Sequence, residues 1–267
     1  MEPVKVVVSG GAGKMGQELL RFLATDPELL IVGALDRAPA VTRDTITIPG
    51  STGVVPFSSD ADALFTRVRP QVWVDFSHAE FTMPVARAAV RQHVNLVIGT
   101  TGLSQENMAE IERLCRSQEV GAVIASNFAL GAVVMIHLAK VAARFFDYAE
   151  ILEMHHEQKA DAPSGTALTT AKEMVAARGR PFAYAPTQKF TVQGTRGGQW
   201  EGVGLHSLRA PGFLAHQEII LGSLGQTLRI RHDTISRECY IPGVSRAIKE
   251  VIRLKRPVFG LDALLGL

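Results

Sequence analysis

Two adjacent histidines open a short stretch whose side chains could transfer a proton. The stretch covers residues 155–167 and reads HHEQKADAPSGTA. Histidine titrates near neutral pH, which suits a general acid or base, and His155 and His156 should point in roughly opposite directions at a strand end. Lys159 adds a cation and a further proton donor. The stretch therefore predicts a site that moves a proton beside a bound anion.

A turn of small residues follows the histidines and leads into an expected helix over residues 167–178. Ser164 is the expected N-cap of this helix. The start of the helix offers backbone N–H groups, together with the Thr166 hydroxyl, to a carboxylate. An anionic substrate could thus bind next to the histidines.

Three structural explanations compete with this functional one. The histidines could bind a metal ion, but no HxxxH pattern or cysteine accompanies them, so no metal is expected. Lys159 could form a solvated pair with Asp161, and His155 could be a core histidine satisfied by hydrogen bonds. Each residue alone favours such an explanation, whereas their clustering favours a functional site.

A second motif has the spacing of a dinucleotide-binding loop. Residues 11–16 read GAGKMG, which matches G-x-G-x-x-G between an expected strand and an expected helix. The glycines let a pyrophosphate approach the backbone at the helix N-terminus. Asp36 ends the next strand, where a carboxylate can accept the ribose hydroxyls of NAD. Arg37 could instead pair with the 2′-phosphate of NADP, so the choice between NADH and NADPH stays open.

Apolar strands and amphipathic helices alternate through the first half of the chain. This alternation is typical of an α/β protein with a Rossmann-type doubly wound parallel sheet, whose strands are covered on both faces. Because ligands bind at the carboxyl ends of such strands, the turns at 99–102 and 125–128 are candidates to line the nicotinamide pocket. The expected strands, some with their turns, cover residues 4–8, 30–35, 72–77, 96–102 and 122–128.

The pattern changes near residue 127, which indicates a second, α+β domain whose strands form an antiparallel or mixed sheet. A helix over about 130–145 precedes a strand that ends in the histidine pair. A final helix is expected over 240–255. Between them, glycine-rich turns separate strands expected at 189–195, 202–209, 215–222 and 226–235.

Composition excludes several classes of protein. The 267 residues include 28 Lys and Arg against 26 Asp and Glu, a net charge of +2, which argues against a nucleic-acid partner. The longest apolar stretch, Phe128–Ile136, is about half the length needed to cross a bilayer, so no membrane association is expected. Cys115 and Cys239 make neither a disulfide framework nor a zinc site. A cytoplasmic protein is expected.

These motifs together resemble the dihydrodipicolinate reductase family. The stretch at 155–167 is similar to the signature of that family, which is far more specific than the glycine loop. The resemblance covers almost the whole chain. It includes GAGKMG at 11–16, DFS at 75–77, GTTG at 99–102, SNFALG at 126–131 and GLDALL at 260–265.

The resemblance implies a Rossmann domain over residues 1–126 and 240–267. It also implies a substrate-binding and oligomerisation domain over 127–239, whose open mixed sheet builds a homotetramer. It implies NADPH or NADH as the cofactor and a small dicarboxylate, 4-hydroxy-tetrahydrodipicolinate, as the substrate, which is reduced in the diaminopimelate route to lysine.

The resemblance also implies roles for individual residues. His155 would be the acid–base residue and Lys159 a proton donor. The substrate carboxylates would be held by His156, Ser164, Gly165 and Thr166. The nucleotide would be contacted by Gly10, Gly11, Ala12, Gly13, Lys14, Met15, Asp36, Arg37, Gly99, Thr100, Thr101, Ala125, Ser126, Asn127 and Phe128.

Two positions depart from the pattern of the family. Lys14 stands where the family commonly has arginine, which keeps the charge and loses the planar fork. In the segment Arg209–Leu221 the one residue that could correspond to the family pattern is His216, so the role of this segment stays open.

Two other functions are compatible with a nucleotide-binding loop. A semialdehyde dehydrogenase that forms an acyl-enzyme would need a nucleophilic cysteine, and neither Cys115 nor Cys239 is well placed. A nucleotide-sensing module without turnover would have no need of the cluster of His155, His156 and Lys159.

Overall fold

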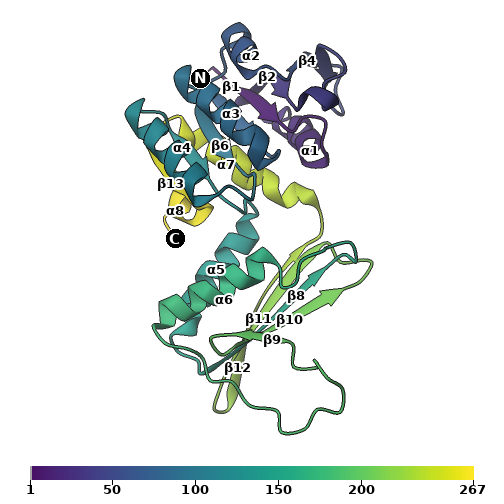
Figure 1. The fold of residues 1–267 in the computed structure, drawn as a ribbon, viewed down its shortest axis with the longest axis vertical. Coiled ribbons are helices and arrows are strands. Elements are labelled where there is room, and N and C mark those ends of the chain that lie inside the picture. The colour runs from purple at the N-terminus through teal and green to yellow at the C-terminus, as the bar shows by residue number, and fades with distance from the viewer. Residues whose placement is uncertain (1) are drawn as a thin grey trace. The chain divides into compact units, whose positions relative to one another are not determined.

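The computed structural model describes residues 2–267, which form two compact units (Figure 1). Unit 1 comprises the chain up to Ala129 together with Tyr240–Leu267, and unit 2 comprises Leu130–Cys239. The first boundary thus lies after Ala129 rather than after residue 126, because the segment before it still packs in unit 1. There the Phe128 ring is buried, with its centroid 5.5 Å from that of Phe76.

Unit 1 is built on an eight-stranded sheet with the order β13-β7-β6-β5-β1-β2-β4-β3. All neighbouring strands run parallel except β3, which is antiparallel to β4. The strands are β1 (Val4–Ser9), β2 (Leu29–Leu35), β3 (Thr45–Thr47), β4 (Val54–Ser58), β5 (Val72–Asp75), β6 (Asn95–Ile98), β7 (Ala122–Ile124) and β13 (Pro257–Phe259).

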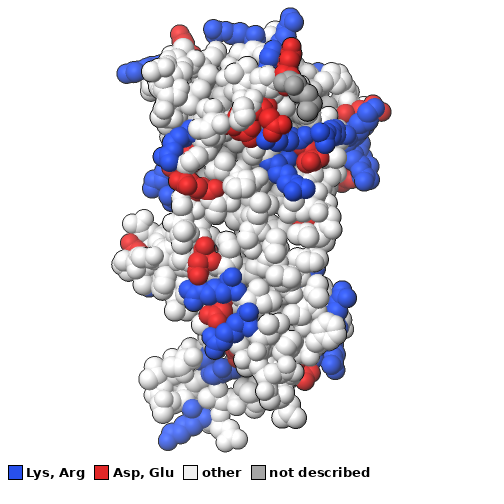
Figure 2. All heavy atoms as spheres, turned by 180° about the vertical axis from the view of Figure 1, so that it is seen from behind, with Lys and Arg blue, Asp and Glu red and all other residues white. Residues whose placement is uncertain are grey.

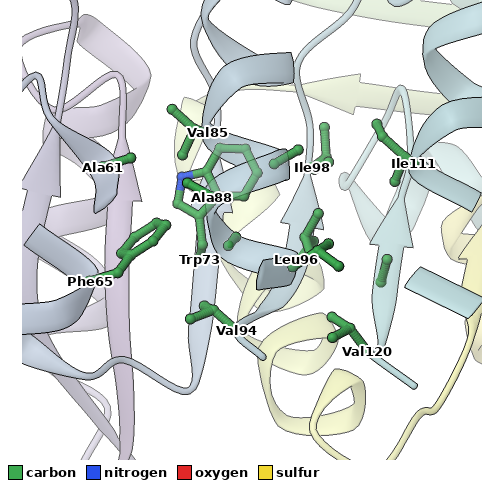
Figure 3. Close-up of a cluster of buried hydrophobic side chains, with 14 of the residues drawn as sticks. Ala61, Phe65, Trp73, Val85, Ala88, Val94, Leu96, Ile98, Ile111 and Val120 are labelled. Carbon is green, nitrogen blue, oxygen red and sulfur yellow. The ribbon is translucent and has the colours of Figure 1, made fainter. Parts of the chain in front are cut away.

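Helices cover both faces of this sheet, which explains why its central strands are largely apolar and buried. Three helices, α2 to α4, pack in sequence on one face, and α1 packs with α7. Figure 3 shows the core beneath the first group, where the fully buried Trp73 donates a hydrogen bond to Ser9 Oγ at 2.7 Å. The helices are α1 (Lys14–Leu23), α2 (Ala61–Val68), α3 (Ala79–Arg91), α4 (Gln105–Ser117), α7 (Ile241–Val251) and α8 (Leu261–Leu265).

Unit 2 has a five-stranded mixed sheet with the order β12-β11-β8-β10-β9. Only β8 and β10 run parallel to each other. Two helices, α5 (Leu130–Ala143) and α6 (Gly165–Arg178), pack together with the sheet around a core that includes Ile151 and Met174. The strands are β8 (Tyr148–His155), β9 (Gly198–Trp200), β10 (Val203–Arg209), β11 (Ala215–Ser223) and β12 (Gln226–Thr234).

The structure corrects the sequence analysis at several elements. The segment 189–195 forms no strand, and its apolar Phe190 and Val192 are exposed. The final helix ends at Val251 instead of continuing to residue 255. The sequence analysis did not assign the short elements β3, β4, β9, β13, α2 and α8.

The surface carries both signs of charge. On the face shown in Figure 2, basic and acidic side chains are intermingled. Several charged side chains of unit 1 form ion pairs, as Arg87 does with Glu110 at 2.7 Å and Arg91 with Asp62 at 2.8 Å. No helix within residues 2–267 is long and apolar enough to span a membrane.

Candidate active site

Glu153 and His155 lie on the same face of β8, near the end of the strand. Alternate residues of a strand point to the same side, and Ala149 and Ile151 on this side belong to the buried core of unit 2. The Glu153 side chain is 1% exposed, whereas that of His155 is 15% exposed. The strand therefore places a buried carboxylate next to a partly accessible imidazole.

The Glu153 carboxylate accepts hydrogen bonds on both oxygens. Its Oε2 lies 2.5 Å from His155 Nδ1. The Arg209 guanidinium donates to both oxygens at 2.8 Å, and Ser164 N–H donates to Oε1 at 3.1 Å. Burial by itself would raise the pKa of Glu153, but the hydrogen bonds from His155 and Arg209 lower it to about 2. Glu153 is therefore ionised at neutral pH.

Lys159 joins this cluster through Asp161. Lys159 Nζ donates to Asp161 Oδ1 at 2.7 Å, and this hydrogen bond lowers the pKa of the Asp161 carboxyl. The guanidinium of Arg209 donates to the Asp161 carbonyl at 2.7 Å. The pair of Lys159 and Asp161, which the sequence analysis considered as the alternative to a functional role, thus exists, and it is attached to the buried carboxylate through Arg209.

The start of α6 lies beside the same carboxylate. Ser164 is the N-cap, as expected, and its Oγ accepts the Ala167 N–H at 3.1 Å. Ser164 is itself buried, whereas Gly165 is exposed and Thr166 half-buried. The N–H groups of Gly165 and Thr166, at the first turn of α6, have no partner of their own helix. His156 is half-buried, and its carbonyl accepts the Lys159 N–H at 3.2 Å.

Two members of this cluster, Glu153 and Arg209, were missed by the sequence analysis. A signal for Glu153 was present, because it stands two residues before His155 in a strand and must share its face. Arg209 reaches the cluster only because β10 pairs with β8 so that Arg209 lies opposite His155. No pattern within the sequence of either strand predicts that pairing.

The turns expected to contact a nucleotide gather at one edge of the unit 1 sheet. In the strand register, Ser9 lies opposite Leu35 and Asp75, Asp75 opposite Ile98, and Ile98 opposite Ile124. The parallel strands therefore end at the same edge. The chain order reverses between β1 and β5, which is where ligands bind in such sheets.

The glycine loop crosses this edge between β1 and α1. Gly10 has a φ of +78°, and the N–H groups of Gly10 and Gly11 donate to the Leu35 carbonyl at 2.9 and 3.1 Å. A Cβ at Gly16 would lie 1.9 Å from the Gly10 carbonyl oxygen, so only glycine allows this close approach. Met15, inside the first turn of α1, is half-buried.

The beginning of α1 suits an anion. Gly13 is the N-cap without a side-chain hydrogen bond, and the first turn has no acidic residue. Ala12, Gly13 and Lys14 are exposed. The first-turn N–H groups of α1, which have no partner within the helix, together with the positive helix end and Lys14, therefore fit the pyrophosphate of a dinucleotide.

Asp36 is buried beside the glycine loop. Its Oδ2 accepts the Ala12 N–H at 2.9 Å, and its Oδ1 accepts the Arg37 N–H at 2.8 Å. An ionised carboxylate has about four acceptor positions, so it can also accept ribose hydroxyls. Arg37 is exposed. The arrangement leaves both NADH and NADPH compatible with this pair.

Thr100 belongs to a buried network around Asp75. Its hydroxyl donates to Asp75 Oδ2 at 2.8 Å and accepts the Ser77 N–H at 2.8 Å. The hydroxyls of Ser77 and Thr82 also donate to Asp75, each at 2.5 Å. The side chain of Thr100 is thus turned inward, whereas Thr101 is exposed and Gly99 half-buried.

The turn after β7 presents one exposed side chain, that of Ser126. Ala125 and Phe128 are buried, and Asn127 Oδ1 accepts the Ala129 N–H at 2.9 Å. This turn therefore offers a ligand mostly backbone and the Ser126 hydroxyl.

The two cysteines do not suit nucleophilic catalysis. Burial raises the pKa of the Cys115 thiol to about 12 and also raises that of Cys239, so neither is an activated nucleophile. Within residues 2–267 no group of histidine, cysteine and acidic side chains is arranged to hold a metal ion.

Two family models match the chain. Dihydrodipicolinate reductase, N-terminus, matches residues 4–128, and Dihydrodipicolinate reductase, C-terminus, matches residues 131–265. The chain belongs to the dihydrodipicolinate reductase family. The resemblance drawn from the motifs is therefore confirmed.

Relatives named 4-hydroxy-tetrahydrodipicolinate reductase match over the whole chain or nearly so. One from Dehalococcoides mccartyi is 50% identical and spans 100% of both chains. One from Moorella thermoacetica is 48% identical and spans 98% of both chains.

Solved structures confirm the expected fold class. Dipicolinate-bound dihydrodipicolinate reductase from Paenisporosarcina sp. TG-14 is 34% identical, with a TM-score of 0.87 over 97% of this chain and 98% of that chain. An amine dehydrogenase from Mycobacterium smegmatis, 17% identical, has a TM-score of 0.67 over 97% of this chain and 95% of that chain. The second likeness shows the fold alone.

Proposed function

We propose that this chain reduces 4-hydroxy-tetrahydrodipicolinate to tetrahydrodipicolinate with NADPH or NADH, in the diaminopimelate route to lysine. Membership of the dihydrodipicolinate reductase family and the names of the relatives support this reaction. The observation that carries it is the cluster in unit 2, where His155 is held by Glu153 beside Lys159 and the start of α6.

The nucleotide binds to the edge of the unit 1 sheet in this proposal. The pyrophosphate lies on the amides at the start of α1, and Asp36 accepts the ribose hydroxyls. The exposed Lys14 and Arg37 supply positive charge, and the turns after β6 and β7 line the nicotinamide end. When bound, the reduced nicotinamide supplies the hydride.

The substrate carboxylates bind at the first turn of α6. The free N–H groups of Gly165 and Thr166 and the Thr166 hydroxyl donate to one carboxylate, and His156 contacts the substrate from its own side of the strand. Ser164 shapes this turn, because its N–H and its Oγ already bond to Glu153 and Ala167. The relative with bound dipicolinate supports a dicarboxylate ligand of this size.

His155 supplies the proton that reduction requires. Addition of a hydride to the conjugated imine leaves an enamine carbon, and protonation of that carbon by His155 completes the reduction. Lys159 donates a proton to the departing hydroxyl, which leaves as water, or neutralises a carboxylate. Glu153 remains ionised beside His155 and stabilises its protonated form.

A homotetramer and a cytoplasmic location complete the proposal. The sheet of unit 2 offers a surface for assembly, because its helices pack on one face while Leu152, Leu208 and Ile220 lie on the opposite side. Light scattering coupled to gel filtration measures the mass of the assembly directly.

A coupled assay tests the reaction. The cyclic substrate is generated from pyruvate and aspartate semialdehyde, and oxidation of NADPH or NADH is followed by absorbance. We expect consumption that depends on the coupling enzyme and falls by about 100-fold or more in His155→Gln. The ratio of the two cofactor rates decides between NADPH and NADH.

A nucleotide-sensing module without turnover is the alternative. It predicts that both nucleotides bind while neither is consumed, and that His155→Gln changes nothing. The ion-paired cluster around a buried glutamate counts against it, because a binding module has no use for an oriented proton donor.

A further inference from the structure

We propose that Glu153 and Arg209 are a pair of positioning residues that leave Nε2 of His155 as the atom that exchanges the catalytic proton. Arg209 also holds the loop that carries Lys159. This inference rests on the proposed acid–base role of His155 and assigns a role to a segment that the sequence analysis left open.

The hydrogen bonds of Glu153 determine the tautomer of His155. Arg209 uses both carboxylate oxygens at 2.8 Å, and Ser164 N–H takes a further position on Oε1. These groups can only donate, so the carboxylate is an acceptor and carries no proton of its own. His155 Nδ1, at 2.5 Å from Oε2, must therefore be the N–H donor. The neutral imidazole then has its lone pair on Nε2.

Arg209 balances the charge that Glu153 places beside the imidazole. Without Arg209, a buried carboxylate at this distance would strongly favour the imidazolium form of His155. The imidazolium would then release its proton less readily. The bidentate guanidinium offsets that effect, while the carboxylate still orients the ring. The two residues therefore act on His155 with opposite electrostatic signs, which a purely structural role would not produce.

Among the groups around His155, Glu153 and Arg209 carry the dominant charges. On β11, the residues in register with His155 and Glu153 are the uncharged Ala215 and Gln217. On β10, Ser207 lies opposite Glu153. In the loop after β8, Lys159 and Asp161 neutralise each other, and His156 follows on the chain. Beyond these, α6 contributes its N-terminal amides.

The same arginine connects His155 to Lys159. One of its nitrogens, Nη2, donates to Glu153 Oε1 and to the Asp161 carbonyl, at 2.8 and 2.7 Å. The Asp161 side chain in turn accepts from Lys159 at 2.7 Å. Movement of Arg209 would therefore disturb both proton donors.

Nitrogen-15 NMR of the histidine rings in the ligand-free full-length protein tests this inference. His155→Gln assigns the His155 signals among those of the eight histidines. Above the pKa of His155 we expect a protonated Nδ1 and an unprotonated Nε2. We expect Glu153→Gln to lower the pKa of His155 and Arg209→Met to raise it.

Glu150→Gln is the matched control. Glu150 lies on the opposite face of the same strand and also pairs with an arginine and a histidine, Arg196 at 2.9 Å and His206 at 2.7 Å. We expect this variant to leave the tautomer and the pKa of His155 unchanged. An equal response to Glu150→Gln and Glu153→Gln would overturn the inference.

Kinetics separate positioning from substrate binding. In Glu153→Gln we expect kcat to fall by about 100-fold with little change in KM, and the pH at which activity declines to move downward. In Arg209→Met that decline should move upward. A protonated Nε2 in the wild type, or pKa shifts of the same sign in both variants, would overturn the inference, even if a variant is too unstable for kinetic work.

The NMR result is independent of the proposed reaction. If the tautomer and the opposite shifts are found but His155→Gln keeps full activity, the positioning pair exists and the acid–base role fails. If His155→Gln is inactive while Glu153→Gln and Arg209→Met leave the ring signals of His155 unchanged at every pH, the reaction stands and the positioning role fails.

Discussion

The two units each bury a carboxylate near a functional edge, and they stabilise it in opposite ways. In unit 2, Glu153 bonds to His155 and Arg209, and its pKa falls to about 2. In unit 1, Asp75 is also fully buried, and burial raises its pKa although the hydroxyls of Ser77, Thr82 and Thr100 act against this. In the proposed mechanism, the carboxylate that stays ionised is therefore the one beside the residue that transfers a proton. Where only the shape of two turns matters, hydroxyl partners suffice.

The candidate sites of the two units also differ in the interactions on which they depend. The nucleotide edge of unit 1 depends on close backbone approach, as at Gly16, where a Cβ would lie 1.9 Å from the Gly10 carbonyl. The cluster of unit 2 depends on side-chain charges, and around Gly165 there is space for a Cβ. Substitutions should therefore act through sterics in unit 1 and through electrostatics in unit 2.

Removal of the Glu153 side chain should have the largest effect on stability. Glu153→Ala leaves the guanidinium of Arg209 without its partner, and Arg209 is only 20% exposed. We expect a loss of about 3 kcal/mol in the free energy of unfolding, at the low end for a broken buried pair because some water still reaches the arginine. Urea unfolding measures it. A loss no larger than that of Arg91→Ala, at an exposed ion pair, would contradict the contrast.

Addition of a methyl group to the glycine loop should come next. Gly16→Ala forces α1 away from Gly10, so we expect nucleotide affinity to fall by about 30-fold, equivalent to about 2 kcal/mol. Titration calorimetry with NADPH and NADH gives the value. Gly165→Ala is the matched control, since nothing lies within 4 Å of the point where its methyl group would stand, and it should bind nucleotide normally. Equal losses in the two variants would refute the steric explanation.

Acid should remove the contribution of Glu153 in a defined range of pH. Its pKa is about 2 in the folded protein against an ordinary value of 4.5, so its stabilising effect is complete above pH 4.5 and disappears as the pH falls towards 2. We expect the stability difference between the wild type and Glu153→Gln to be constant at neutral pH and to shrink across this range. Urea midpoints at a series of pH values test this, and a constant difference down to pH 2 would contradict it.

Asp75→Asn should have the smallest effect. Since burial raises the pKa of Asp75, its ionised form costs stability as the pH rises above the ordinary value of 3.8. Asparagine removes that charge but brings an amide that needs acceptors, so we expect a change within about 1 kcal/mol at pH 7. The balance should shift in favour of asparagine from pH 4 to pH 7. A loss as large as that of Glu153→Ala would show that the two carboxylates are equivalent.

Periodicity predicted the long elements of both units well. Three elements lie within one or two residues of their expected bounds: the strand expected over 4–8 (β1), the helix expected over 130–145 (α5) and the strand expected over 215–222 (β11). These segments have strong apolar patterns that packing on a sheet reinforces. By contrast, β3, β4 and β9 are short, and only their hydrogen bonds to a neighbouring strand define them. The alternation at 189–195 was misleading because no strand pairs with it.

The candidate site could be predicted only as far as local sequence reaches. His155, Lys159 and Ser164 stand close together in the chain, and the structure connects them as a cluster. Arg209 could not be found in this way, because its position depends on the register of β10 against β8. For Thr100 the sequence indicated the right turn, but the inward direction of its hydroxyl follows from the burial of Asp75.

The discontinuity of unit 1 has a consequence for the order in which the protein is made. The chain leaves unit 1 after Ala129 and returns at Tyr240, and β13 then pairs with β7. All of unit 2 is therefore synthesised before β13, the strand that completes the sheet of unit 1. Until β13 has been synthesised, β7 is an unpaired edge strand of the incomplete sheet. Unpaired edges favour aggregation and chaperone binding during synthesis.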